Sequence, residues 1–262
     1  MCVTCGCSDD SATKMTSTAV HSHEHDHTHE HEHKHDHTHE PTSMQKGRVI
    51  TLEEKILAKN DHIAEHNREW FESVNVLALN LVSSPGSGKT ALLERTISDL
   101  KNKVEIAVLE GDQATSNDAE RIRRAGCSVL QINTGAGCHL DASMIASALK
   151  ELKPTHNSLL LIENVGNLVC PALFDLGEKH KVVVLSITEG EDKPIKYPHM
   201  FRAAEIMLLN KIDLLPHLNF DIEACKQYAL SVNPKLKIIE VSATTGQGLE
   251  QWYEWLMAGI AC

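Results

Sequence analysis

The sequence has no excess of basic residues. It holds 25 Lys and Arg against 36 Asp and Glu, for a formal net charge of −11. A protein that binds nucleic acid through its phosphates usually presents a surplus of Lys and Arg on one face. The composition therefore argues against a nucleic-acid-binding surface, and an anionic ligand would need a local positive site.

Long apolar runs are also missing. No stretch reaches the ~18 consecutive apolar residues of a membrane-spanning helix, and the N-terminus has no basic region followed by an apolar one, as a secretory signal would. We therefore expect a cytoplasmic protein with no membrane association. In a reducing compartment, cysteines serve as thiols and metal ligands more often than as disulfides. The chain has eight cysteines: Cys2, Cys5, Cys7, Cys127, Cys138, Cys170, Cys225 and Cys262.

The first 43 residues show almost no apolar periodicity. From His21 to His39 every odd-numbered position is a histidine, separated by charged and small polar residues. Such a segment cannot bury a core. We predict three parts: a cysteine motif at residues 1–7, a disordered histidine-rich segment at 8–43, and a folded domain at 44–262.

The folded domain reads as alternating helices and apolar runs. It opens with an amphipathic helix over 51–70, whose apolar side we expect to hold Leu52, Ile56, Ile63 and Trp70. Strands are predicted near residues 76–82, 105–109, 129–132, 159–162, 182–187, 206–209 and 238–241. Further helices are predicted near residues 90–100, 119–124, 141–152, 220–231 and 248–257. Continuously apolar strands between helices predict an α/β fold with a mostly parallel, doubly wound sheet, and ligands then bind at the carboxyl ends of the strands.

The stretch "SSPGSGKT" (Ser83–Thr90) follows the first strand and opens a helix, the context of a phosphate-binding loop. Ser83 stands where the usual motif has its first glycine. Glycines allow the backbone N–H groups and the helix N-terminus to approach phosphates, Lys89 supplies a positive charge, and the Thr90 hydroxyl suits Mg²⁺. The nucleotide-contacting residues predicted here are Gly86, Ser87, Gly88, Lys89 and Thr90. The alternative is a plain Gly-Ser turn before a helix.

Two later motifs indicate guanine. "NKID" follows a late strand, so Asp213 can accept hydrogen bonds from guanine N1–H and the 2-amino group while Asn210 and Lys211 brace the loop. Adenine cannot reproduce that pairing, and a hydrogen-bonding site rejects the wrong base strongly. Ser242 and Ala243 belong to "VSAT", which is similar to a loop that contacts guanine O6. The three motifs together favour GTP over ATP.

Two acids are placed to hold Mg²⁺. Asp112 follows the second strand and Glu163 ends the fourth, so both lie at the phosphate edge. Mg²⁺ takes oxygen ligands and keeps several waters, so one or two carboxylates with Thr90 and the phosphates suffice. A helix cap at Asp112 and a surface acid at Glu163 are the alternatives, and Asp118 is a weaker candidate.

Thiols and an imidazole follow the third and fourth strands. Cys138, His139 and Cys170 fall at the nucleotide edge, and their donors suit Zn²⁺ or Ni²⁺. Three protein ligands leave a tetrahedral site open for water or a partner chain. The alternative is that both cysteines are small buried apolar residues.

The N-terminal "CVTCGC" brings three thiolates within six residues, and with the terminal amine Cys2, Cys5 and Cys7 would suit square-planar Ni²⁺. An exposed reactive-thiol tail is the alternative. The ten tail histidines can bind several Ni²⁺ or Zn²⁺ ions weakly, which indicates storage or capture, although a solvated linker has a similar composition.

Together, "CVTCGC", the histidine-rich spacer, "SSPGSGKT", "GDQATSND", "GCHL", "IENVGNLVCP" and "NKID" resemble the HypB family, GTPases that assist nickel incorporation into NiFe hydrogenases. The resemblance covers nearly the whole chain, and Ser83 is usual in that family. It implies a SIMIBI-class P-loop NTPase that slowly converts GTP to GDP and phosphate with Mg²⁺ and forms a GTP-dependent homodimer. It also implies a zinc or nickel site at Cys138, His139 and Cys170 and a tight nickel site at Cys2, Cys5 and Cys7. The partners implied are a HypA-type nickel-delivery protein and the hydrogenase large-subunit precursor.

Two other functions stay open. A nickel or zinc storage protein with weak GTPase activity would also carry the histidines. A urease-type nickel-insertion GTPase shares the phosphate loop and NKxD, but it typically has a Cys-Pro-His metal motif, which "GCHL" does not match.

Overall fold

A computed structural model of the chain describes residues 43–112 and 117–260. The chain divides into two units, residues 1–55 and 56–262, and the second unit contains the sheet and the helices that pack on it. The predicted cysteine motif at 1–7, with Cys2, Cys5 and Cys7, and the tail histidines lie outside the described residues.

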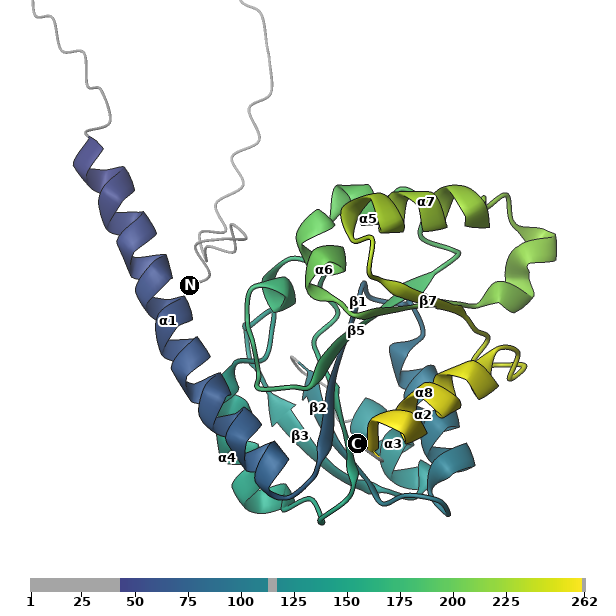
Figure 1. Cartoon of the computed structure of the whole chain (residues 1–262), viewed down its shortest axis with the longest axis horizontal. Helices are drawn as coiled ribbons and strands as arrows, with labels where there is room; N and C mark the ends of the chain where they lie inside the picture. Colours follow the sequence, from purple (N-terminus) through teal and green to yellow (C-terminus); the bar gives the residue numbers. More distant parts are fainter. Residues whose placement is uncertain (1–42, 113–116, 261–262) are drawn as a thin grey trace, which may run out of the picture. The chain divides into compact units, whose positions relative to one another are not determined.

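Seven strands form one sheet, and every pairing between them is parallel (Figure 1). Their order is β3-β2-β4-β1-β5-β6-β7. The predicted doubly wound α/β fold is therefore confirmed, and all of its described strands are parallel. The strands are β1 (Leu77–Ser83), β2 (Ile106–Asp112), β3 (Ser128–Asn133), β4 (Leu159–Glu163), β5 (His180–Ser186), β6 (Ile206–Asn210) and β7 (Lys237–Glu240).

Helices cover both faces of the sheet. On one face α2 (Lys89–Leu100), α3 (Asn117–Ala125) and α8 (Leu249–Ile260) bury their apolar sides. The end of α1 (Ser43–Ser73) and α4 (Ala142–Leu152) pack on half of the other face, and α6 (Pro198–Ala203) and α7 (Ile222–Val232) on its remaining half. Three short elements complete the set: η1 (Cys170–Ala172), α5 (Lys193–Lys196) and η2 (Ile212–His217).

The alternation of side chains along β1 explains why five of its seven residues are apolar. Leu77, Leu79 and Leu81 pack under α2 and α8, whereas Ala78 packs on the side of α1 and α4. All seven residues of β1 are buried. Because successive strand residues point to opposite faces, a strand covered by helices on both sides must be apolar at nearly every position.

The prediction for the packing side of α1 is wrong for Leu52 and Ile56, whereas Trp70 packs against the core and Ile63 is half-buried. Leu52 and Ile56 are exposed, and the buried positions nearer the helix end are Asn60, Ala64, Asn67 and Phe71. The two asparagines bond to backbone groups instead of lying outside: Asn60 accepts from Ala142 N and donates to Asp175 O, and Asn67 donates to Ala142 O and Leu176 O. Hydrogen bonding offsets the cost of burying these amides.

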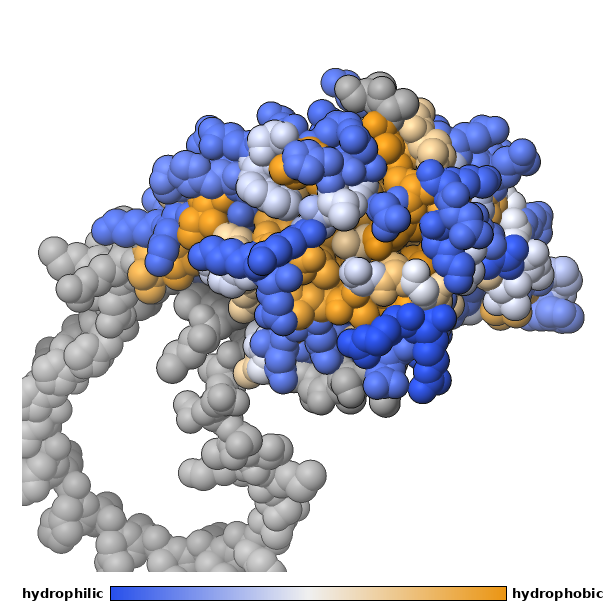
Figure 2. All heavy atoms as spheres, turned by 90° about the horizontal axis from the view of Figure 1, so that it is seen from below, coloured by the Kyte–Doolittle hydropathy of each residue, from blue (hydrophilic) through white to orange (hydrophobic). Residues whose placement is uncertain are grey.

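The order of the strands sets where a ligand can bind. On one side of β1 lie β4, β2 and β3, and on its other side lie β5, β6 and β7. The strand order therefore reverses its direction at β1. At such a position the loops that follow neighbouring strands turn to opposite faces of the sheet and leave a crevice at the carboxyl ends of the strands. Among the described residues no helix has the length and apolar content of a membrane span, and the face drawn in Figure 2 shows apolar side chains in patches bordered by hydrophilic ones.

Candidate functional site

The loop from β1 to α2 has the shape of a phosphate cradle. Gly88 caps α2 in the left-handed region, with φ of +91°, and Gly86 has φ of +77°. A Cβ on Gly88 would lie 2.6 Å from Asn210 Nδ2, so this position needs glycine for both its conformation and its close contact. The first N–H groups of the twelve-residue helix α2 are directed toward the loop, where an anion would be stabilised.

The predicted guanine motif bonds directly to this loop. Asn210 Nδ2 donates to Ser87 O at 2.9 Å, and Lys211 Nζ donates to Gly86 O at 2.6 Å. Asn210 Oδ1 accepts from Ala243 N at 3.2 Å. The three predicted nucleotide motifs are therefore joined at one edge of the sheet, although their positions in the sequence lie far apart.

Ser242, in the "VSAT" motif, orients the Asp213 side chain. The Ser242 hydroxyl donates to Asp213 Oδ1 at 2.5 Å and accepts from Thr245 N at 3.0 Å. Asp213 is half-buried, and Ser242 is fully buried. The carboxylate is thus oriented before any base arrives, which favours selective hydrogen bonding.

A cleft of about 470 Å³ opens beside the phosphate loop. Its walls are the loop and the carboxyl ends of β2 and β4, with Asp112, Asp118 and Glu163 among the lining residues. Thr90 Oγ1 donates to Glu163 Oε1 at 2.7 Å, and Lys89 Nζ lies 3.4 Å from the same oxygen. Lys89, Thr90 and Glu163 therefore converge, and Asp112 lines the same cleft.

Glu110 is a cleft residue that the sequence analysis missed. It is 3% exposed and pairs in register with Glu163 across β2 and β4. Burial raises the pKa of Glu110 to about 8, and the negative charge of Glu163 contributes to the same rise. The signal in the sequence was the spacing "EGD", because residues two apart on a strand point to the same face, so Glu110 points the same way as Asp112.

The acids of the cleft fit a cation. Among the described residues, Glu110 Oε2 and Glu163 Oε2 are buried and have no hydrogen-bond partner. A buried carboxylate oxygen without a partner is costly unless a charge or donor compensates it. Oxygen donors at this position suit Mg²⁺.

A second missed acid supports the phosphate loop from β5. Glu189 Oε1 accepts from the Ser87 hydroxyl at 2.6 Å and from Ser186 N at 3.0 Å. Lys193 Nζ lies 3.7 Å from its other oxygen. No motif in the sequence marks this residue, because its role depends on a contact with a loop 102 residues away.

The thiols and the imidazole also converge. The ligand atoms of Cys138, His139 and Cys170 all lie within 4.8 Å of one another, with the two Sγ atoms 3.0 Å apart and Cys138 Sγ 3.6 Å from His139 Nδ1. Burial lowers the pKa of His139, which favours the neutral, metal-binding imidazole. Its ring packs on Phe174, with centroids 3.9 Å apart. Two sulfurs and one nitrogen in this arrangement suit Zn²⁺ or Ni²⁺.

A buried polar chain begins at Asn164, the residue after Glu163. Asn164 Oδ1 accepts from Leu140 N at 3.1 Å, and its amide donates to Asn80 Oδ1 at 3.1 Å. Asn80 Nδ2 in turn donates to Glu178 Oε1 at 3.0 Å. Leu140 follows His139 in sequence, so this chain ties the end of β4 to the imidazole loop.

The same chain ends at the loop of the second thiol. Lys181 Nζ lies 3.5 Å from Glu178 Oε1 and donates to Pro171 O at 2.9 Å and to Phe174 O at 3.2 Å. The side chains of Lys181 and Glu178 are only 8% and 5% exposed. An unpaired charge here would be costly, so displacing the Cys170 loop would also disturb Glu178 and Asn80. The buried polar chain (Asn164, Asn80, Glu178 and Lys181) therefore connects the cleft with the loops that carry His139 and Cys170.

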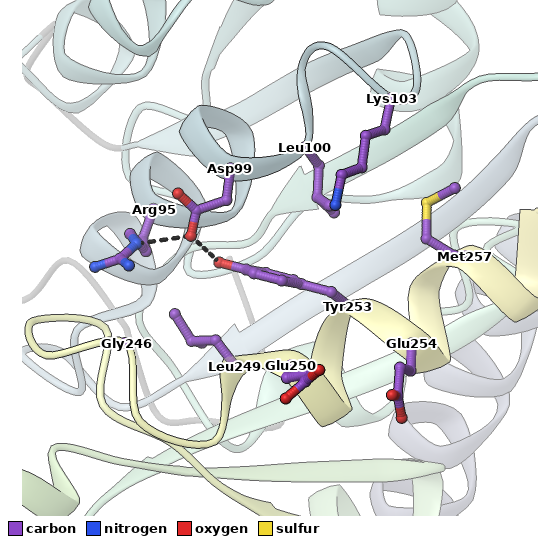
Figure 3. Close-up of a pocket in the computed structure, with 10 residues that line it drawn as sticks. All are labelled: Arg95, Asp99, Leu100, Lys103, Gly246, Leu249, Glu250, Tyr253, Glu254 and Met257. Atoms are coloured by element: carbon purple, nitrogen blue, oxygen red, sulfur yellow. Dashed lines mark hydrogen bonds and ion pairs between the residues drawn. The ribbon is translucent and has the colours of Figure 1, made fainter.

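A second cavity, also of about 470 Å³, lies between α2 and α8 (Figure 3). Asp99 stands at its wall between Arg95 and Tyr253, accepting from Arg95 Nε at 2.8 Å and from the Tyr253 hydroxyl at 2.9 Å. These polar groups bond to one another, and residues of the predicted nucleotide and metal motifs do not line the cavity. The phosphate-loop cleft is therefore the candidate functional site.

Comparison with known proteins supports the same site. The family model described as "CobW/HypB/UreG, nucleotide-binding domain" matches residues 77–240. The hydrogenase maturation factor HypB of Rhizobium leguminosarum bv. viciae is 61% identical over 218 residues, which are 83% of this chain and 73% of that protein. The HypB of Escherichia coli K12 is 61% identical over 213 residues, covering 81% and 73%.

Two solved structures are also similar. The crystal structure of HypB from Archaeoglobus fulgidus has a TM-score of 0.73 and 44% identity, covering 78% of this chain and 99% of that one. The structure of HypB from Helicobacter pylori in complex with nickel has a TM-score of 0.72 and 39% identity, covering 78% and 95%.

Proposed function

Because the chain belongs to the HypB hydrogenase maturation factors of the CobW/HypB/UreG family, we propose that it is a GTP-hydrolysing metallochaperone. It binds nickel as cargo and assists its insertion into the precursor of a NiFe hydrogenase. The observation that carries this proposal is the direct bonding of Asn210 and Lys211 to the phosphate loop. These two hydrogen bonds join the proposed guanine-binding motif and the phosphate loop into one continuous site.

The cleft residues have separate tasks in GTP hydrolysis. Lys89 and Thr90 both contact Glu163 in this structure, and a bound nucleotide would draw the ammonium toward the β- and γ-phosphates. Thr90, Glu163, Glu110 and Asp112 are the residues that would hold Mg²⁺, directly or through water. Bound Mg²⁺ would neutralise charge that develops on the phosphate oxygens.

Nickel or zinc would bind at Cys138, His139 and Cys170. Three protein ligands leave a place for a fourth, and we propose that a second copy of the chain supplies it in a GTP-dependent homodimer. A HypA-type protein would deliver nickel, and the hydrogenase large-subunit precursor would receive it. The relative from H. pylori is a nickel complex, which supports the same cargo here. Cys2, Cys5 and Cys7 are proposed as a further, tight nickel site.

Storage of metal is the second candidate function, and the ten tail histidines favour it. Multiple imidazoles bind several ions weakly, which suits capture. A urease-type function is less favoured because the chain has Cys138-His139 and not Cys-Pro-His.

Asp213→Asn tests the base assignment. Asparagine keeps the oxygen that accepts from Ser242 but replaces the other carboxylate oxygen with a donor, so the loop stays in place while the pairing with guanine is lost. A hydrogen bond to a charged group contributes about 1.5–3 kcal/mol, so GTP should bind roughly 10- to 100-fold more weakly. Xanthosine triphosphate should bind better than it does to the intact chain. Affinities from calorimetry decide this, with Asp61→Asn on the exposed side of α1 as the matched control. Unchanged GTP affinity would remove the guanine assignment.

Deleting residues 21–39 separates storage from the nucleotide cycle. We expect fewer Ni²⁺ ions per chain by elemental analysis, because ten imidazoles are lost, and an unchanged rate of GTP hydrolysis. If GTP hydrolysis fell with the deletion, the histidine-rich segment would be part of the catalytic fold and the division at residue 44 would be wrong.

A further inference from the structure

The outer side of α1 carries a histidine pair that the proposed function does not use. His62 and His66 lie one helical turn apart, and their ring centroids are 4.7 Å apart with the planes at 70°. Residues four apart on a helix share a face, so the two rings are neighbours because of the helix geometry. The buried positions Asn60, Ala64 and Asn67 mark the opposite side.

The spacing of the rings fits a shared metal ion. An ion about 2.1 Å from one nitrogen of each ring, at an angle of about 90° to 109°, would place the centroids roughly 4.6 to 5.3 Å apart. The observed 4.7 Å falls within that range. Two histidines at this helical spacing are also the metal-binding pair of H-E-x-x-H sites. The centroid separation therefore allows both rings to reach one ion after side-chain rotation.

A carboxylate orients one of the rings. Glu69 Oε2 lies 3.4 Å from His66 Nδ1, on the next turn of the helix. Metal-binding histidines usually donate their second ring N–H to a carboxylate, which fixes the tautomer and the direction of the ring. With Nδ1 directed at Glu69, Nε2 of His66 is the nitrogen presented to an ion.

These side chains are open to solvent and have no packing role. The side chains of His66 and Glu69 are 62% and 69% exposed, and His62 is exposed as well. An ion can therefore reach the pair without any rearrangement of the fold.

We propose that His62 and His66 form a binding site for a borderline divalent cation, Ni²⁺ in this protein, with Glu69 as the positioning residue and water completing the coordination. Imidazole nitrogen suits Ni²⁺, and two protein ligands hold it exchangeably. The site is separate from Cys138, His139 and Cys170 and requires no nucleotide, so it stands or falls independently of GTP hydrolysis. It gives the chain a position for cargo on a folded element.

The test is a Ni²⁺ titration by calorimetry on the full-length chain. To remove competing ligands, the ten tail histidines are replaced by asparagine, and Cys2→Ser, Cys5→Ser and Cys7→Ser are added. We expect His62→Ala with His66→Ala to remove one Ni²⁺ per chain, and Cys138→Ala to remove a different one. His156→Ala, at an exposed histidine in a turn, should remove none. Unchanged stoichiometry and affinity after loss of both His62 and His66 would overturn the proposal.

Glu69→Gln tests the positioning role, with Glu65→Gln as the control. Both residues are exposed acids on α1, so each substitution removes one negative charge. Loss of an outer carboxylate typically weakens metal binding by ~10-fold or more, and only Glu69→Gln should weaken the His62/His66 site by that much. Equal weakening by both would mean that general charge, and not orientation of His66, governs the affinity. GTP hydrolysis, measured on the same variants, should not change.

Discussion

Lys89→Ala should abolish GTP hydrolysis while leaving intact the nickel binding proposed for Cys2, Cys5 and Cys7. The Lys89 side chain is 10% exposed, and its ammonium lies 3.4 Å from Glu163 Oε1, at the entrance to the phosphate loop. It is the positive charge that would meet the β- and γ-phosphates. Losing one preorganised donor to a transition state costs roughly 10²- to 10³-fold in rate, and we expect at least that reduction in single-turnover phosphate release.

Lys150→Ala, at an exposed position of α4, is the matched control for this measurement. Because Lys89 also offsets the acids of the cleft, thermal unfolding should be recorded with each variant, and Lys89→Gln provides a longer neutral side chain. Hydrolysis that continued at the original rate in a folded Lys89→Ala protein would show that Lys89 has been misassigned.

Cys138→Ala should remove metal binding from the Cys138, His139 and Cys170 cluster and, with it, any effect of Ni²⁺ at that cluster on GTP affinity. Cys138 Sγ is 3.0 Å from Cys170 Sγ and 3.6 Å from His139 Nδ1, so it is the central donor of the cluster. Without the Cys138 thiol, this chain offers the ion only two donors, His139 and Cys170. We also expect Ni²⁺ or Zn²⁺ to promote dimerisation more weakly in this variant, as measured by sedimentation.

Two controls separate this effect from a general loss of cysteine. Burial raises the pKa of Cys127 to about 11, so that thiol stays protonated and is a poor ligand, and Cys127→Ala should leave metal binding unchanged. Cys2→Ala should cost only the N-terminal nickel site. Identical behaviour of the Cys138 and Cys127 variants would contradict the metal assignment.

The buried polar chain gives a physical reason to expect that metal and nucleotide affect each other. Asn164 follows Glu163 and accepts from Leu140 N beside His139, while Lys181 donates to Pro171 O beside Cys170. Each member is buried, so movement of one loop leaves a polar group elsewhere unsatisfied. Displacing one member of such a network costs free energy because its partner loses a hydrogen bond. The nucleotide site and the metal cluster can therefore bias the same loops.

Much of the nucleotide site follows from local sequence. Gly86 and Gly88 have positive φ, which glycine adopts most readily, and Asp213 follows β6, whose carboxyl end lies at the ligand edge of the sheet. Short motifs in the expected order therefore predicted the positions of the phosphate loop and of the Asp213 loop. The strands were predicted because β1 and its neighbours are covered on both faces and are therefore mostly apolar.

What the sequence could not indicate depends on distant contacts or on very short elements. Glu189 supports the phosphate loop only through its contact with Ser87, 102 residues away. The helices α5 and α6 have four and six residues and each begins near a proline, so no apolar period is long enough to detect. The α1 prediction failed in part because two of the buried positions are asparagines that bond to backbone groups, and a hydrophobic pattern assigns asparagine to the solvent side.

The most direct test of coupled GTP and nickel binding is to measure the Kd of a non-hydrolysable GTP analogue with and without Ni²⁺, and the Kd of Ni²⁺ with and without the analogue. The protein would be the full-length chain with the tail histidines replaced by asparagine and Cys2, Cys5 and Cys7 replaced by serine, alongside its Cys138→Ala and Cys127→Ala versions. Linkage requires both affinities to change by one common factor, typically ~5- to 150-fold, and Cys138→Ala but not Cys127→Ala should reduce it to one. Affinities that are independent of each other in the protein that retains Cys138 would contradict the account.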